Sequence, residues 1–205
     1  MKKLTISLIC MILATGTVIA QEQFTFGPKV GIDLTHLWGK DCPHGILFNY
    51  QTGAFLEYRF TDKFSIAPEV VFAAQGGKAN VVEYLDESVI TNGSANVLYH
   101  FNYINIPMIL KFYVIPKLSI DLGPQVGINV YSKATVKAKA EGVSASYTKE
   151  FEGVKSVDFG LGLGATYNIT DKIFVQGRYT MGLTRAVEAV DVMNGNIQLA
   201  AGYRF

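Results

Sequence analysis

Strict alternation of apolar residues with polar or small ones is the feature that most constrains how this chain folds. In residues 24–35 every even position is apolar, from Phe24 to Leu34, and every odd position carries Thr, Gly, Lys or Asp. The alternation recurs in residues 50–60, 64–74, 104–112, 118–130, 157–169, 173–183 and 197–205. Because successive side chains of a β-strand point to opposite faces, this period of two predicts eight strands.

The two faces of these strands differ in charge. The apolar face carries no charged residue, whereas the opposite face carries five acids and five bases among glycines such as Gly31 and Gly123. The charged residues are Lys29, Asp33, Glu57, Arg59, Glu69, Lys111, Asp121, Asp158, Arg178 and Arg204. Glycines beside charges suit a narrow lumen, and balanced signs suit mutual pairing in an enclosed space. We therefore expect these residues to form a charge network inside a barrel whose apolar face contacts lipid.

The lengths of the connections favour a membrane barrel over a soluble barrel with its apolar face inside. Residues 61–63, 114–117 and 170–172 form tight connections, whereas residues 36–49, 76–103, 132–155 and 185–195 form long ones. Aromatic residues gather near the tight connections, as in the interfacial girdle of a membrane barrel. The chain is thus predicted to be an all-β, eight-stranded antiparallel up-and-down transmembrane β-barrel with short periplasmic turns and long extracellular loops.

Aromatic side chains are also expected inside the barrel. Phe55, Tyr113, Tyr131 and Phe174 lie on the charged face of their strands. An eight-stranded barrel has an interior that side chains just fill. The lumen is therefore predicted to be plugged, and a narrow porin-like channel for small solutes is the alternative.

The first residues have the anatomy of a secretory signal. Lys2 and Lys3 precede an uncharged stretch that ends at Ala20. We expect residues 1–20 to be a signal peptide and residues 21–205 to be the outer-membrane β-barrel domain, with both mature termini in the periplasm. Since Cys10 falls within the signal, Cys42 would be the single cysteine of the mature chain, and no internal disulfide is expected.

No catalytic, metal or cofactor site is predicted, and the chain is not expected to be an enzyme. His36, His44 and His100 lack the spacing to a nucleophile or base that would define a catalytic site. Asp41 and Cys42 join the first two histidines in one loop, and these residue types bind zinc, but one cysteine and two histidines in a flexible loop do not suffice to predict a site. A formal net charge of +1 gives the chain no field that would attract nucleic acid.

The end of the chain carries a second targeting feature. Apolar residues alternate up to Tyr203 and Phe205. This ending resembles the C-terminal insertion signal of Gram-negative outer-membrane proteins. The resemblance implies that Tyr203 and Phe205 are read by the barrel-assembly machinery during insertion.

Four segments resemble the PorT-like family of small outer-membrane β-barrel proteins, often labelled porin-family or outer membrane protein beta-barrel domain. They are YINIPMILKF at 103–112, LGPQVG at 122–127, VDFGLG at 157–162 and RYTMGL at 178–183. The resemblance covers residues 24–205 and implies a small barrel. The family often has Glu where this chain has Asn105, so a lumenal partner for Lys111 must come from elsewhere.

The long connections are the expected place of function. The connection at 132–155 contains Lys133, Lys137, Lys139, Lys149 and Lys155. These lysines would contact acidic lipopolysaccharide or lie on a solvated extension of the strands, and their alternation with apolar residues favours the extension. We expect a monomeric outer-membrane protein in contact with membrane lipid, with a structural or partner-binding role through its extracellular loops. A narrow channel or a part in PorT-type protein secretion are the alternatives.

Overall fold

The computed structural model describes residues 23–40, 42, 45–80, 93–140, 143–188 and 190–205. They form nine β-strands: β1 Phe24–Gly39, β2 Leu47–Arg59, β3 Phe64–Asn80, β4 Gly93–Ile115, β5 Leu118–Ala140, β6 Val143–Glu150, β7 Val157–Asn168, β8 Ile173–Gly182 and β9 Val192–Tyr203. Within this part of the chain, the search for a helix long and apolar enough to cross a membrane found none. The predicted signal peptide, residues 1–20, lies outside the described residues.

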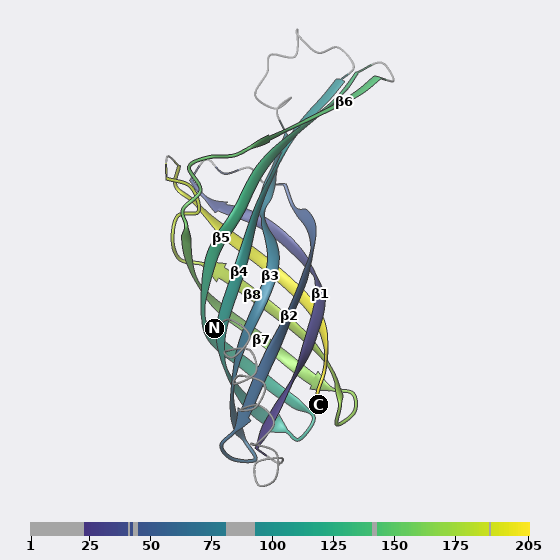
Figure 1. Ribbon diagram of the computed structural model, residues 1–205, viewed down its shortest axis with the longest axis vertical. Helices are drawn as coiled ribbons and strands as arrows, with labels where there is room; N and C mark the ends of the chain where they lie inside the picture. The colour runs from purple at the N-terminus through teal and green to yellow at the C-terminus, as the bar shows by residue number, and fades with distance from the viewer. Residues whose placement is uncertain (1–22, 41, 43–44, 81–92, 141–142, 189) are drawn as a thin grey trace, which may run out of the picture.

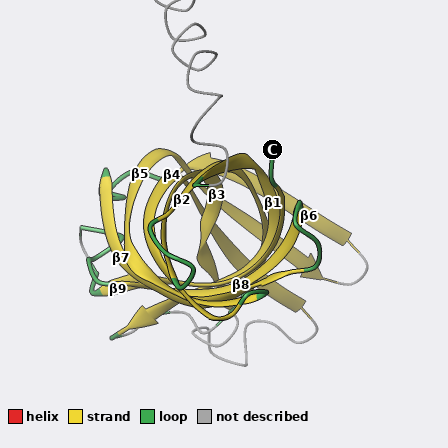
Figure 2. Cartoon of the chain, turned by 90° about the horizontal axis from the view of Figure 1, so that it is seen from below, coloured by secondary structure: helices red, strands yellow, loops and turns green. Residues whose placement is uncertain are grey.

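Eight of the strands close into a barrel. All neighbours pair antiparallel in the order β4-β3-β2-β1-β9-β8-β7-β5, and pairing of β4 with β5 completes the ring. Seen from below, the strands form a closed ring (Figure 2). Closure leaves no strand edge exposed within the wall, which is the condition for a sheet that spans lipid. The predicted all-β up-and-down barrel of eight strands is confirmed.

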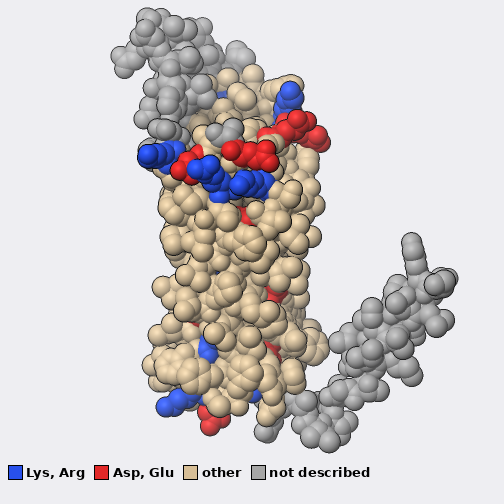
Figure 3. All heavy atoms as spheres, turned by 90° about the vertical axis from the view of Figure 1, so that its left-hand side faces the viewer, with Lys and Arg blue, Asp and Glu red and all other residues tan. Residues whose placement is uncertain are grey.

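The barrel is apolar outside and polar inside. Leu163 and Leu199 are 58% and 57% exposed on the outer wall, whereas Lys29 and Asp33 are 2% and 0% exposed. On the face drawn in Figure 3, charged atoms gather near the two ends and the wall between them is mostly uncharged. A water-soluble barrel has its apolar side chains inside and its polar side chains outside. The opposite distribution seen here is that of a barrel surrounded by lipid.

The two ends of the barrel differ in their connections. At one end, which we call the tight-turn end, the repeated sequence Thr-Asp-Lys at 61–63 and 170–172 forms two matching turns. In the first, Thr61 Oγ1 accepts a hydrogen bond from the Phe64 amide at 3.1 Å; in the second, Thr170 Oγ1 accepts one from the Ile173 amide at 2.9 Å. Gln23 and Phe205 also lie there, each hydrogen-bonded through its backbone to a neighbouring strand. The longer connections lie at the opposite end, the loop end (Figure 1).

Two of the predicted long loops are largely strand. The segment predicted as a loop at 76–103 begins with the end of β3 and ends in β4, and only residues 81–92 lie outside the described chain. The segment at 132–155 contains the end of β5 and all of β6. β6 pairs with the upper part of β5, above the part of the same edge that pairs with β7. The resulting sheet projects beyond the barrel (Figure 1), as the strand-extension interpretation predicts.

The predicted inward position of Tyr131 is wrong. Asn102 pairs with Tyr131 and Tyr103 pairs with Asn129, so Val130 is an extra residue in β5, a β-bulge. A shift of one residue moves the following side chains to the other face of a strand. Tyr131 is therefore 44% exposed on the outer wall beside Val130.

Candidate functional site

Glu69 on β3 lies at the centre of a polar network that fills the lumen. It accepts a hydrogen bond from Lys29 Nζ on β1 at 2.6 Å, and two from the Arg178 guanidinium on β8 at 3.1 and 2.7 Å. β3 and β8 lie on opposite sides of the ring. All three side chains are buried. The ion pairs therefore tie opposite walls together and occupy the middle of the lumen.

Gln176 links this cluster to a second acid, Asp121. Its side-chain oxygen accepts a hydrogen bond from Lys29 at 2.9 Å, and its Nε2 donates to Asp121 Oδ2 at 3.0 Å. Asp121 also accepts hydrogen bonds from the hydroxyls of Ser119 and Thr166. The Asp121 carboxylate is therefore held by neutral donors, and the described residues give it no ion pair.

A second ionic cluster surrounds Glu57, nearer the tight-turn end. Its carboxylate lies 3.4 Å from Lys111 Nζ and 3.5 Å from Arg204 Nη2. Ser65 and Tyr113 donate their hydroxyl hydrogens to the other carboxylate oxygen. Because Asn105 carries no charge, the sequence predicts that another residue pairs with Lys111 inside the lumen. That residue is Glu57 on β2.

Two aromatic rings fill the space beside these clusters. Phe55 and Phe174 meet edge to face, with 5.1 Å between ring centroids. The Arg204 guanidinium lies 4.6 Å from the Phe174 centroid, where a cation is attracted by the ring face. Phe174 can reach across because its strand partner is Gly202, which has no side chain to occupy that space.

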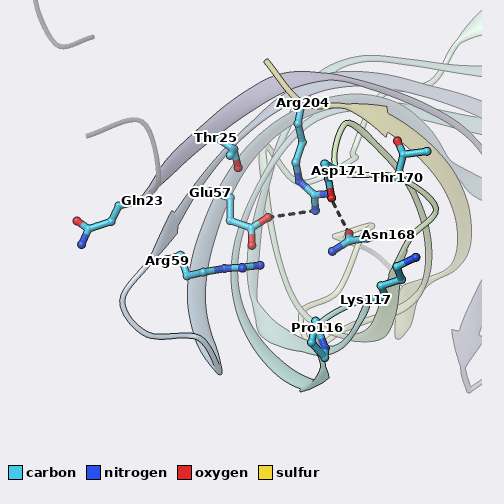
Figure 4. A pocket seen from close by; sticks show the side chains of 10 residues that line it. All are labelled: Gln23, Thr25, Glu57, Arg59, Pro116, Lys117, Asn168, Thr170, Asp171 and Arg204. Atoms are coloured by element: carbon cyan, nitrogen blue, oxygen red, sulfur yellow. Dashed lines mark hydrogen bonds and ion pairs between the residues drawn. The ribbon is translucent and has the colours of Figure 1, made fainter. Parts of the chain in front are cut away.

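At the tight-turn end the lumen opens into a cavity of about 370 Å³. Its charged lining residues are Glu57, Arg59, Lys117, Asp171 and Arg204 (Figure 4). The Arg59 guanidinium lies 4.2 Å from the Tyr113 ring centroid and is only half-buried. Arg59 therefore lies at the mouth of the barrel, apart from the ion pairs deeper inside.

Toward the loop end the lumen is lined by amides and hydroxyls. Asp33 accepts a hydrogen bond from Gln51 at 2.7 Å, and Asp158 accepts from Thr184 at 2.7 Å and Asn194 at 3.0 Å. Among the acids of the lumen, Glu57 and Glu69 form ion pairs with bases, as the balanced charges predict. The three aspartates are held by neutral side chains instead.

An apolar cluster of buried residues lies at the loop end of the barrel, and sequence reasoning missed it. Its buried members are Leu37, Cys42, Phe101, Tyr103, Ala186, Val187 and Val192. Phe151 packs against it, with ring centroids 5.3 Å from Tyr99 and 5.9 Å from Phe101. A backbone bridge between Val154 and Val187 joins two of the loop-end connections. The available signal was a run of large apolar residues on the lumen face of β4, at Phe101 and Tyr103.

The two described histidines, His36 and His100, lie on different strands that are not neighbours in the ring. His36 on β1 stacks on Tyr179 with ring centroids 6.2 Å apart, and His100 lies on β4 opposite Lys133. Asp41 and His44 lie outside the described residues, and the Cys42 thiol is buried in the loop-end cluster. Within the residues that the structure describes, no group of three or more potential ligands is placed to hold a metal ion.

The projecting sheet is formed by the loop-end parts of β3, β4 and β5 together with β6. Its inner face, continuous with the lumen wall, carries Tyr99, Val136 and Tyr147, the last 67% exposed. Its outer face carries Lys78, Lys133 and Lys137. Among the described residues β6 pairs with β5 alone, so its second edge is unpaired.

Comparison with solved structures finds similarity to small outer-membrane barrels. The attachment invasion locus protein Ail of Yersinia pestis is 17% identical, covers 89% of this chain and 99% of its own, and has a TM-score of 0.45. Neisserial surface protein A is 13% identical with coverages of 88% and 97% and a TM-score of 0.46. For OprG of Pseudomonas aeruginosa these values are 11%, 89%, 95% and 0.36. No curated protein sequence matches this chain.

The family of this chain follows from a match to a protein-family model. The model described as "Outer membrane protein beta-barrel domain" matches residues 19–188, well over half of the chain. The match spans β1 to β8 of the closed, lipid-facing ring. The chain therefore belongs to the outer membrane protein beta-barrel domain family, whose members are barrels of the bacterial outer membrane.

Proposed function

We propose that this protein is a non-enzymatic outer-membrane barrel that does not conduct solutes and binds a partner through the sheet that it projects outside the cell. The tight-turn end, with both mature termini, faces the periplasm in this proposal, because short turns mark the periplasmic side of bacterial barrels. The observation that carries it is the combination of a filled lumen with a strand, β6, that lies wholly outside the ring.

Three layers of side chains argue against a channel. The Glu57 cluster, the Glu69 cluster and the apolar loop-end cluster follow one another along the axis, and each contains buried side chains from several strands. In a planar-bilayer recording of the purified protein we expect no steady current. Stepwise conductance that scales with protein concentration would support the narrow-channel alternative instead.

The edge of β6 supports a binding role. An unpaired edge offers backbone donors and acceptors to an extended segment of another chain. The side chain of Tyr147, in the middle of β6, is largely exposed and adds an aromatic contact. A photo-crosslinking residue at position 147 should therefore give a discrete adduct on intact cells. The same residue at Asp62, in a tight turn, is the matched control, and equal or no labelling at the two positions would contradict the proposal.

We infer from the four segments that resemble PorT-like proteins that this chain belongs to that branch of the family. A part in protein secretion is the second candidate function, and the resemblance alone favours it. We expect a deletion strain to secrete its usual set of proteins. Loss of a secreted subset, restored by the intact gene, would favour the secretion role over surface binding.

We infer a maturation route from the two ends of the chain. Removal of residues 1–20 would leave Gln21 first, and N-terminal sequencing of the outer-membrane form tests this. Tyr203 and Phe205 point outward at the tight-turn end, with ring centroids 5.2 Å apart, which suits recognition by the assembly machinery before closure. Removal of Phe205 should reduce the assembled fraction of a protein that we expect to be monomeric.

A further inference from the structure

The lysines of the projecting sheet are sorted between its two faces. On β4, Ile104, Asn102 and His100 follow one another along the outer wall, since the pairing of β3 with β4 runs without a shift from Val71↔Asn105 to Asn80↔Asn96. Lys78 pairs with Leu98 and therefore continues the same outer wall on β3. The outer face of the sheet is thus an extension of the lipid-facing surface of the barrel.

The β-bulge at Val130 brings two further lysines to this wall. Beyond the bulge, Lys133 pairs with His100 and Lys137 pairs with Asn96. Without the extra residue, the alternation of β5 would direct Lys133 and Lys137 to the inner face. The bulge therefore places the two lysines of β5 on the same side of the sheet as Lys78 of β3.

The basic wall begins directly beyond the apolar part of the outer wall. Below it on β5, the outward side chains of Ile128 and Val130 are 44% and 56% exposed, and Tyr131 follows at the level where interfacial aromatic residues lie. Lys133 is two residues further on, about 7 Å along the strand. The lowest lysine of the wall therefore follows closely on the last exposed apolar side chains of β5.

The charge of the wall is complementary to a phosphorylated membrane surface. Lys78, Lys133 and Lys137 share it with one described acid, Glu150, which pairs in register with Lys133 but forms no ion pair with it. On the inner face, Lys149 stands among Tyr147 and Val136. A lysine ammonium binds phosphate as a compact charge.

We infer that Lys78, Lys133 and Lys137 form a lateral binding site for phosphate groups of the outer-leaflet lipid, the phosphorylated glycolipid lipid A. The site is separate from the partner-binding edge of β6, so either can fail without the other. It holds the projecting sheet upright at the membrane surface through the lipids that surround the barrel.

Lipid retention in nanodiscs tests this inference. The full-length mature protein is reconstituted in phosphatidylcholine nanodiscs with a small fraction of lipid A, and retained lipid is counted by native mass spectrometry. We expect the protein to prefer lipid A over its dephosphorylated form. The double variant Lys133→Gln/Lys137→Gln should lose roughly fivefold in retention per lysine. Lys149→Gln removes one positive charge from the opposite face, to be compared with the loss per lysine, and should change retention less than twofold.

Three outcomes would overturn the site. They are equal retention of dephosphorylated lipid A, an equal loss in Lys149→Gln, and displacement of lipid A by equimolar inorganic phosphate. The heat-dependent electrophoretic shift of folded barrels reports the folding of each variant. Should the double variant not fold, the single change Lys78→Gln on β3 tests the same wall.

Discussion

Arg178 and Glu69 face each other from opposite walls of the barrel and join through two hydrogen bonds, Nη1 to Oε2 at 3.1 Å and Nη2 to Oε1 at 2.7 Å. The same carboxylate accepts a third hydrogen bond, from Lys29. One acid therefore balances two cations in a part of the lumen that excludes solvent. The charge of the cluster depends on Glu69 more than on either base.

Replacement of Glu69 by Gln should strongly destabilise the barrel. The change leaves two buried cations without a counter-charge, and removal of one member of a buried ion pair costs about 3–5 kcal/mol. The measurement is denaturant unfolding in lipid vesicles, followed by the fluorescence of Trp38, the single tryptophan. Glu188→Gln removes an exposed carboxylate and is the matched control. An unchanged midpoint for Glu69→Gln would show that the cluster contributes nothing to stability.

Gly202 should not tolerate even a methyl group. A Cβ built on Gly202 would lie 2.2 Å from Cζ of Phe174, whose ring is held between Phe55 and the Arg204 guanidinium. Gly202→Ala should therefore cost about 1–3 kcal/mol of unfolding free energy, as overpacking does. Gly177 has no atom within 4 Å of its Cβ position, so Gly177→Ala should not destabilise. A similar loss of unfolding free energy in both variants would show that replacing any glycine of the barrel is destabilising, and that the clash with Phe174 is not the cause.

The eight barrel strands could be predicted because the signal for them is local. Each residue in the lipid region faces either hydrocarbon or lumen, so alternation within one segment defines its strand, as at Phe24 to Leu34. In the parts of the strands that project beyond the lipid, side chains no longer have to alternate between hydrocarbon and lumen. The extension of β4 and β5 and the addition of β6 then depend on which segments pair, which a single strand does not reveal.

The sequence predicts which side chains lie inside the lumen, but it does not predict which of them are in contact. Burial of Lys29, Glu69 and Arg178 follows from their phase within each strand, but their meeting depends on the stagger of strands around the ring. Tyr131 shows the same limit, because a β-bulge is defined by the partner strand. The loop-end cluster brings together residues that are far apart in the sequence, such as Leu37 and Val187.

A charge placed on the outer wall should interfere with the membrane barrel. Leu163 lies in the middle of β7, paired with Leu122, and is 58% exposed toward the surroundings of the barrel. Leu163→Arg should cost about 2–4 kcal/mol if that surface contacts the bilayer midplane. Tyr147→Arg changes a side chain that is 67% exposed in the projecting sheet and should have little effect on folding. Equal stability of both variants in lipid vesicles would contradict the orientation of the barrel.

The Cys42 thiol reports whether the loop-end cluster stays closed. It is 8% exposed and packs in the cluster with Leu37 and Phe101. Because a buried thiol reacts only when its surroundings open, a water-borne maleimide should label the folded mature protein at least about tenfold more slowly than the unfolded chain. Phe101→Ala removes a ring from the cluster and should speed labelling, whereas Phe48→Ala, on the outer wall, should leave the rate unchanged. Rapid labelling of the folded, unsubstituted protein would mean that the loop end is open to water.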